Sequence, residues 1–285
     1  MRRTNMILAT IVAGVAVSVL AVSSGLADTI NFEAPAYTGS ADGVAIEGQQ
    51  TWIASPYASS SVYTYTGNAL GLPANPAGGA QFLGAQSGSG SSASTVLHRG
   101  NTTINVASPT SYDIAYDFCV SGASTAGNWI AESLVGSSKT TLGYSQWFDW
   151  DVGGQSVTLS YRFYDQAGNI PADHQSVMKG IPVDQWLHLV TAVDFASGKA
   201  GITGITLTNL TTSATQTVAT GGWLFPDQTR ALPKTMSLYV GGQSSTTGNI
   251  VGFDNLSVTA TPEPASLALL GLGGLLLMPR RRRSN

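Results

Sequence analysis

The sequence predicts an all-β fold in which two sheets pack face to face as a sandwich. Apolar and polar residues alternate with period two along most of the chain, which is typical of strands that bury one face. Clusters of Gly, Ser, Pro and Asn separate these segments, and no window outside the two termini carries a helical stripe. Because each apolar face needs a second sheet to cover it, we expect a two-sheet sandwich of jelly-roll type.

Each expected strand combines alternation with β-branched or aromatic residues. In residues 111–120, every second residue from Tyr112 to Val120 is apolar, and Asp113 and Asp117 fall on the opposite face. Turn signals such as Gly153-Gly154 end the segments. The expected strands are residues 29–33, 62–66, 95–98, 102–106, 111–120, 128–135, 156–164, 185–195, 202–210, 236–240 and 250–258.

Residues 28–261 are expected to form a single domain, because neither an internal repeat nor a long linker divides them. A chain of this length can bury a sizeable core without disulfides or metals. The segment holds 7 Lys and Arg against 15 Asp and Glu, a net charge of −8, whereas the basic termini bring the whole chain to −3. Nucleic acid and anionic lipid both require clustered basic residues, so the composition argues against them as partners and leaves neutral glycans open.

The metal-binding and redox residue types are sparse. Cys119 is the only cysteine, so no disulfide can form within the chain, and we expect it to be a small strand residue. His98, His174 and His188 are scattered without metal-ligand spacing. We expect His188 to take part in sheet packing.

The first 27 residues have the three-part layout of a secretory signal peptide. Arg2 and Arg3 precede an apolar run over residues 6–22, and the segment ends on small residues at Gly25 and Ala27. We therefore expect a signal helix, recognition by signal peptidase and cleavage after Ala27. The alternative is an uncleaved membrane anchor, because about 17 apolar residues approach the length that spans a bilayer.

The last 24 residues change character abruptly. Pro262, Glu263 and Pro264 lead into an apolar segment over residues 265–278, and the chain closes with a basic cluster. An apolar run of this length is short for a hydrocarbon core of about 30 Å. The basic residues would hold that end on the cytoplasmic side. They are Arg280, Arg281, Arg282 and Arg283.

This order of tripeptide, short membrane segment and arginine cluster resembles the PEP-CTERM sorting tail. The resemblance covers residues 262–285 and implies recognition by an exosortase-type enzyme of a Gram-negative bacterium. It implies transient residence in the inner membrane through a short transmembrane helix, and then the outer surface or extracellular matrix. Proteins with such tails are associated with exopolysaccharide and biofilm. A permanent tail anchor or a chance apolar end is the alternative.

The domain also resembles the concanavalin A-like (laminin G-like) jelly rolls. The resemblance rests on Phe32-Glu33 near the start, on Trp186 and His188 in the middle, and on the Phe253-Asp254-Asn255 end. It implies that the first and last strands are adjacent, which would bring Glu33 near Asp254. Two such carboxylates, with Asn255 and backbone carbonyls, could hold a structural Ca²⁺. Alternatively, Asp254 and Asn255 cap a turn before the last strand.

The run 144–151 is the densest group of aromatic and acidic residues. On a strand, Trp147, Asp149 and Asp151 would share one face, with the two carboxylates about 7 Å apart. That spacing suits a pair acting on a glycosidic bond. Retaining glucanases of the resembled fold usually carry glutamates at three successive same-face positions. Here Trp147 occupies the first position and both acids are aspartates, so Asp149 and Asp151 are weak catalytic candidates.

Two other interpretations of the same run remain open. In the first, Trp147 or Trp150 stacks on a sugar, and Asp149, Asp151 or Gln146 binds its hydroxyls. In the second, the tryptophan rings belong to the core and the aspartates flank the turn before Gly153-Gly154.

From these observations we expect an exported, non-catalytic surface or matrix module that binds glycans. Extracellular polysaccharide is its expected partner, and Ca²⁺ is the only cofactor considered. A polysaccharide-active enzyme, either a lyase or a glycoside hydrolase on the same fold, is the first alternative. A purely structural surface protein without a specific ligand is the second.

Overall fold

The structure is a computed structural model, and it describes most of the expected domain. The predicted signal segment before Ala27, the expected strand 102–106 and the whole tail 262–285 lie outside the described residues. Those described are residues 27–50, 52–54, 60–86, 95–99, 111–122, 129–135, 144–151, 153–165, 169–170, 172–194, 198–226, 236–240 and 249–261.

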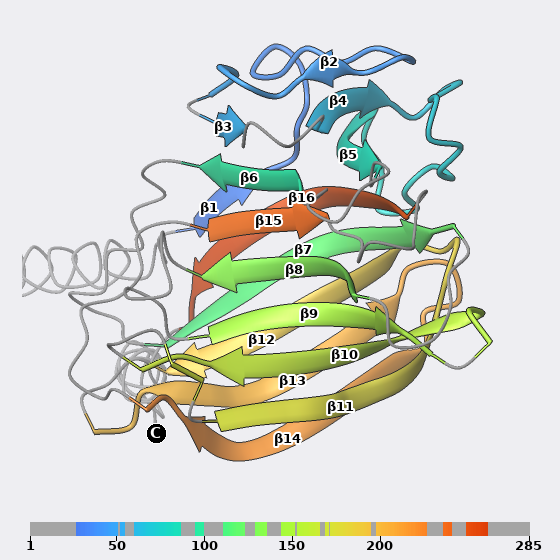
Figure 1. Cartoon of the computed structure of the whole chain (residues 1–285). Helices are drawn as coiled ribbons and strands as arrows, with labels where there is room; N and C mark the ends of the chain where they lie inside the picture. The colour runs from blue at the N-terminus through green and yellow to red at the C-terminus, as the bar shows by residue number, and fades with distance from the viewer. Residues whose placement is uncertain are drawn as a thin grey trace, which may run out of the picture.

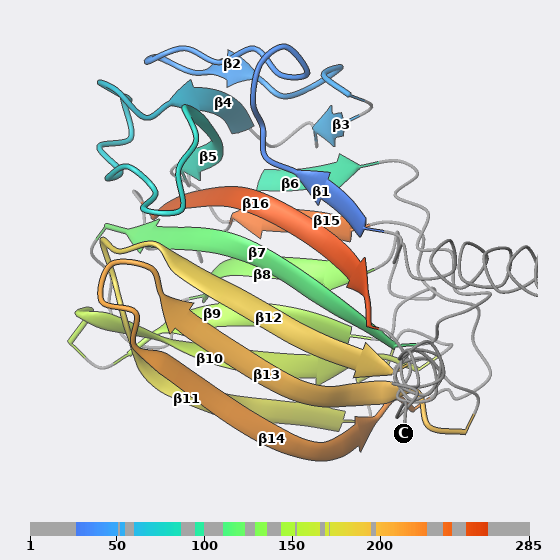
Figure 2. The same ribbon diagram turned by 180° about the vertical axis from the view of Figure 1, so that it is seen from behind.

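Two antiparallel sheets face each other, so the expected all-β sandwich is confirmed. The seven-stranded sheet is nearer the viewer in Figure 1, and the nine-stranded sheet is nearer in Figure 2. The described residues contain strands and no helix. Within that same part of the chain, no helix is long and apolar enough to cross a membrane.

The nine-stranded sheet holds the first and last described strands side by side. Asp28 in β1 pairs with Val258 in β16, which is the adjacency that the sequence predicts. The sheet order is β14 (Thr215–Leu224), β13 (Gly201–Asn209), β12 (Leu187–Asp194), β7 (Ser111–Ser121), β16 (Ile250–Ala260), β5 (Gln81–Gln86), β4 (Ser60–Thr64) and β2 (Val44–Ala45), with β1 (Ala27–Ile30) beside β16.

The seven-stranded sheet closes the other side of the core. Its order is β11 (Ala172–Pro182), β10 (Ser156–Phe163), β9 (Tyr144–Trp150), β8 (Trp129–Val135), β15 (Met236–Val240), β6 (Thr95–Arg99) and β3 (Trp52–Ala54). The run 144–151 is therefore a strand, β9, in the middle of this sheet.

Period-two alternation fills the space between the sheets. In β12, Leu187, Leu189, Thr191 and Val193 are buried, whereas the residues that alternate with them are partly exposed. The facing strand β10 contributes Leu159 and Tyr161, which are fully buried. Because both sheets send alternate residues inward, a single apolar core forms between them.

A polar cluster lies inside this core and joins the two sheets. Gln146 from the seven-stranded sheet accepts a hydrogen bond from the Tyr116 hydroxyl at 2.8 Å. Its amide nitrogen donates to the Tyr161 hydroxyl at 3.1 Å and to Thr191 Oγ1. All four residues are at most 2 % exposed, so the polar atoms of Gln146 find partners only within the protein.

The expected strands do not include β5, β11 and β14, although each has six residues or more. Nearly all side chains of the edge strand β14 are exposed, so its two faces do not differ in burial. In β11 the pairing with β10 shifts register twice. β5 is buried along most of its length and reads as a short apolar run. Alternation predicts strands with one buried face and misses these cases.

Candidate functional site

We call the outer face of the nine-stranded sheet the open face. On the outer face of the seven-stranded sheet, Ser145 and Ser160 are almost completely buried, whereas Asp149 and Arg162 are partly exposed. On the open face, His188, Val190, Ala192 and other outward residues keep part of their surface exposed. The open face is therefore where the described residues can meet a large ligand.

A row of polar side chains crosses this open face. Directly paired residues of antiparallel strands point to the same face. The register aligns Thr215 with Thr208, Thr208 with His188, His188 with Asp117, and Asp117 with Asp254. We call these five residues the cross-strand row. The next rows along the strands hold only small residues and Asp113: Thr217, Thr206, Val190, Ala115, Ser257, Ala219, Gly204, Ala192 and Thr259.

One end of the same face is covered by residues 65–80, which we call the covering loop. Leu72 of the loop packs so closely on the sheet that a Cβ at Gly252 would lie 2.8 Å from its Cδ1. Trp186 packs into the same cluster and donates its indole N–H to the Pro73 carbonyl at 2.7 Å. Asp117 and Asp254 therefore lie at the border between the covered and the open parts.

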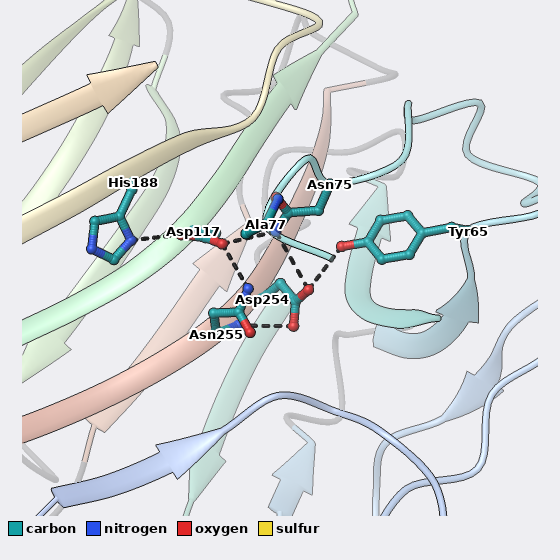
Figure 3. A network of polar contacts seen from close by, with 7 residues as sticks. All are labelled: Tyr65, Asn75, Ala77, Asp117, His188, Asp254 and Asn255. Carbon is teal, nitrogen blue, oxygen red and sulfur yellow. Dashed lines mark hydrogen bonds and ion pairs between the residues drawn. The ribbon is translucent and has the colours of Figure 1, made fainter. Parts of the chain in front are cut away.

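The two aspartates form the centre of a hydrogen-bond network (Figure 3). Asn75 Nδ2 donates to Asp117 Oδ2 at 2.8 Å and approaches Asp254 Oδ2 at 3.5 Å. The Tyr65 hydroxyl donates to Asp254 Oδ2 at 2.8 Å. Asn255 gives its side-chain amide to Asp117 at 2.7 Å and its backbone N–H to Asp254 at 2.8 Å. Both carboxyl groups are therefore held by donors from the loop and the sheet.

Burial sets the protonation of Asp254. Asp254 is 1 % exposed, and burial is the largest cause that raises its pKa, to about 7. The hydrogen bonds from Tyr65 and Asn255 lower it, whereas the neighbouring charge of Asp117 raises it further. The pKa of the Tyr65 phenol is also raised, by burial and then by Asp254. Near neutral pH the network therefore holds one proton on Asp254 about half of the time.

His188 is the member of the network that reaches the open face. Its Nδ1 lies 2.6 Å from Asp117 Oδ1, and its side chain is 35 % exposed. The second ring nitrogen points away from Asp117 (Figure 3). A carboxylate at Nδ1 favours the tautomer that carries its proton there, which leaves Nε2 as an acceptor. The imidazole can thus accept a hydrogen bond from a hydroxyl on the open face, or act as a base.

The tryptophans of β9 are buried. Trp150 is 2 % exposed and donates its indole N–H to Asn249 at 3.1 Å. Trp147 is 5 % exposed, with the Arg162 guanidinium 4.3 Å above its ring. Gln146 belongs to the polar cluster in the core. A ring with no exposed face cannot stack on a sugar, so these residues support the interpretation that places the rings in the protein interior.

The aspartates of the same run have local structural partners. Asp149 accepts the Trp147 indole N–H at 2.6 Å. Asp151 accepts hydrogen bonds from Ser156 at 2.6 Å, from Thr158, and from the Gly180 backbone at 3.2 Å. Burial raises the pKa of Asp151, but these hydrogen bonds outweigh it, and the pKa is below its usual value. A general acid needs a raised pKa, so Asp151 is poorly suited to that role.

Glu33 and Asp254, the predicted calcium ligands, approach the same point. A Cβ at Gly79 would lie 2.7 Å from Glu33 Oε1 and 3.7 Å from Asp254 Oδ2. Glu33 Oε1 accepts backbone N–H groups from Ala80 at 2.6 Å and Gln81 at 3.0 Å. Such donors occupy lone pairs that a cation would need. In the part of the chain that the structure describes, no three His, Cys, Asp or Glu side chains are grouped to hold a metal, and calcium stays a prediction.

Cys119 has the structural role that the sequence predicts. It is fully buried under the covering loop, and burial raises the pKa of its thiol to about 12, with Asp184 adding to the effect. A thiol with this pKa is not a nucleophile at neutral pH.

Sequence reasoning missed Tyr65, Asn75 and Asp117 as partners of Asp254. Asp117 was visible only as a polar residue on the outer side of a strand, and the other two come from a loop. Pairing over 189 residues, as between Tyr65 and Asp254, leaves no local signal in the chain.

Comparisons with known proteins give no family for this chain. No protein-family model matches it, and no curated protein matches it. The structure is similar to a carbohydrate esterase from the Shiga toxin-encoding bacteriophage phi24B, with 14% identity, 78% of this chain and 98% of that chain covered, and a TM-score of 0.45. It is also similar to lectin II from Ulex europaeus, with 11% identity, 82% of this chain and 97% of that chain covered, and a TM-score of 0.45. For the alginate lyase vAL-1 from Chlorella virus, the identity is 12%, the coverage is 75% of this chain and 95% of that chain, and the TM-score is 0.44. TM-scores below 0.5 at such identities carry no inference about function.

Proposed function

We propose that this protein is an exported, non-catalytic surface module with a concanavalin A-like jelly roll whose open face binds polysaccharide. The observation that carries the proposal is the cross-strand row, in which buried Asp117 fixes the exposed His188 among Thr208 and small neighbours. Hydroxyl, carboxyl and imidazole groups are hydrogen-bonding partners for sugar hydroxyls. No aromatic ring of the described residues stands exposed on this face, so binding would rest on hydrogen bonds.

The charges of the sheet favour a neutral or amino-sugar polysaccharide. The register places Asp113, Asp117, Asp194 and Asp254 on the open face, and the nine strands of this sheet contain no Lys, Arg or Glu. Uronic-acid chains would meet like charge on such a face, whereas neutral or cationic sugars would not.

A second candidate function is catalysis by the His188–Asp117 pair. A histidine held by a buried carboxylate is the arrangement of a general base. This candidate moves the expected chemistry from Asp149 and Asp151 to the opposite sheet. If the native chain releases unsaturated or reducing ends from a bound polysaccharide, and His188→Ala does not, the result would favour the enzyme over the binding module.

Glycan binding is tested on an array that carries neutral, amino-sugar and uronic-acid oligomers. We expect binding to the first two classes, and we expect His188→Ala to weaken it about tenfold by removing one hydrogen bond to the ligand and the anchor on Asp117. The matched control is His174→Ala, because His174 belongs to β11 of the other sheet. Its ring stacks on that of Trp223, with 4.0 Å between the ring centroids. Unchanged affinity in His188→Ala, or no binding by the native chain, would remove the open face as a glycan site.

The sorting proposal concerns the two ends of the chain and is tested separately. The basic–apolar–small layout before Ala27 and the Pro262–Arg283 tail support export, arrest in the inner membrane and release by an exosortase-type enzyme. Intact-mass spectrometry of protein recovered from the cell surface should give a mass without residues 1–27 and 265–285. A mass that retains residues 265–285 would instead show a permanent anchor.

A further inference from the structure

Among the described residues, the two sheets have five edge strands, and four of them carry features that hinder pairing with another strand. Natural sheets protect their edges by short strands, bulges and charged residues. β2 is two residues long, β3 is three, and β1 is four and carries Asp28. β11 has two register shifts against β10 and carries Lys179. These four edges are poor templates for a further strand.

The fifth edge, the first half of β14, has none of these features. Residues 215–219 (Thr-Gln-Thr-Val-Ala) contain neither charge nor proline, and they pair with β13 without a register shift. Four of the five side chains are exposed, and Val218 is partly exposed. β14 lies along the outer side of the sandwich in both views (Figures 1 and 2). The regular edge ends at a register shift near Gly221 and Gly222, both at positive φ.

We propose that residues 215–219 of β14 pair with the same segment of a second copy of this chain. An antiparallel pair around a two-fold axis at Thr217 sets Thr215 opposite Ala219 and Gln216 opposite Val218, so no like charges meet. The rest of the domain surface is acidic, with 15 Asp and Glu against 7 Lys and Arg in residues 28–261. Two copies therefore repel each other over most orientations and approach most easily at this neutral edge.

The pairing would join the open faces of two copies on one surface. A two-fold axis perpendicular to the sheet keeps the same face of both copies on the same side. Five strand spacings, about 24 Å, would then separate the two His188 residues across the strands, and an offset of four residues adds about 14 Å along them. A polysaccharide strand crossing both copies would gain avidity from two weak sites. The pairing itself rests on the edge strand and is independent of glycan binding.

The test measures the mass of the full chain in detergent by size-exclusion chromatography with light scattering over a concentration series. We expect the mass to rise from one copy to two as concentration increases. Thr217→Lys places a charge on the edge and should hold the protein at one copy. The matched control is Thr206→Lys, because Thr206 is the register partner of Thr217 on the inner strand β13, and this variant should still form dimers.

A second measurement needs no variant. Amide hydrogen exchange of residues 215–219 should slow at high concentration, because the edge N–H groups become paired. For the variants described above, thermal unfolding checks that both lysine variants fold. A native chain with the mass of one copy at every concentration overturns the proposal. A dimer that Thr217→Lys retains, or one without protection of residues 215–219, overturns it equally.

Discussion

Replacing Asp254 by asparagine should make the protein more stable at pH 8 than the native chain. The folded state keeps the Asp254 proton up to about pH 7, whereas the usual pKa is 3.8. Between these values the folded state binds more protons than the unfolded state, so the free energy of unfolding falls as pH rises. The shift corresponds to about 4 kcal/mol over that window. Urea unfolding from pH 4 to pH 8 measures the difference between the two proteins.

Asp151→Asn is the matched control, because its pKa shift has the opposite sign. The hydrogen bonds to Asp151 outweigh its burial and lower its pKa, so its ionised form stabilises the fold above the usual carboxyl pKa. Asp151→Asn should therefore lose stability at neutral pH and match the native chain at low pH. An Asp254→Asn variant that is less stable than native at pH 8 and unchanged in slope would show that Asp254 is ionised in the folded state.

Gln146→Leu should destabilise the fold by about 3 kcal/mol at neutral pH. The change removes an acceptor for the buried Tyr116 hydroxyl and a donor to Tyr161 and Thr191. Equilibrium unfolding in urea gives the free energy directly. The glycan interpretation of Gln146 expects the reverse pattern, normal stability with weakened sugar binding.

The triple variant Gln146→Leu, Tyr116→Phe and Tyr161→Phe separates lost hydrogen bonds from lost packing. Replacing all partners by apolar groups of similar shape removes the unsatisfied atoms, so most of the lost stability should return. If the triple variant is as unstable as the single one, the cost comes from side-chain shape and not from the hydrogen bonds.

The strands that alternation predicts agree with the structure because burial on one face leaves a local pattern. The segments 111–120, 156–164 and 202–210 fall on β7, β10 and β13 within two residues. β14 and β11 went unrecognised, since an exposed edge strand and a bulged strand do not alternate.

The candidate site shows the same division more sharply. The run 144–151 drew attention because aromatic and acidic residues are adjacent in sequence, yet the structure buries Trp147 and Trp150 and gives Asp149 and Asp151 local partners. The network around Asp254 assembles residues 65, 75, 117, 188, 254 and 255 from distant parts of the chain, and no spacing rule connects them.

By itself, the sequence predicted the all-β sandwich, because side-chain alternation is a local property of the chain. The adjacency of the first and last strands was implied by the resemblance of the end motifs to concanavalin A-like jelly rolls. Only the tertiary structure decided that the covering loop lies over one end of the nine-stranded sheet, and that Asp117 holds His188 at its edge. Those facts depend on which strands pair and on where a loop packs, and each is set by contacts between residues far apart in the chain.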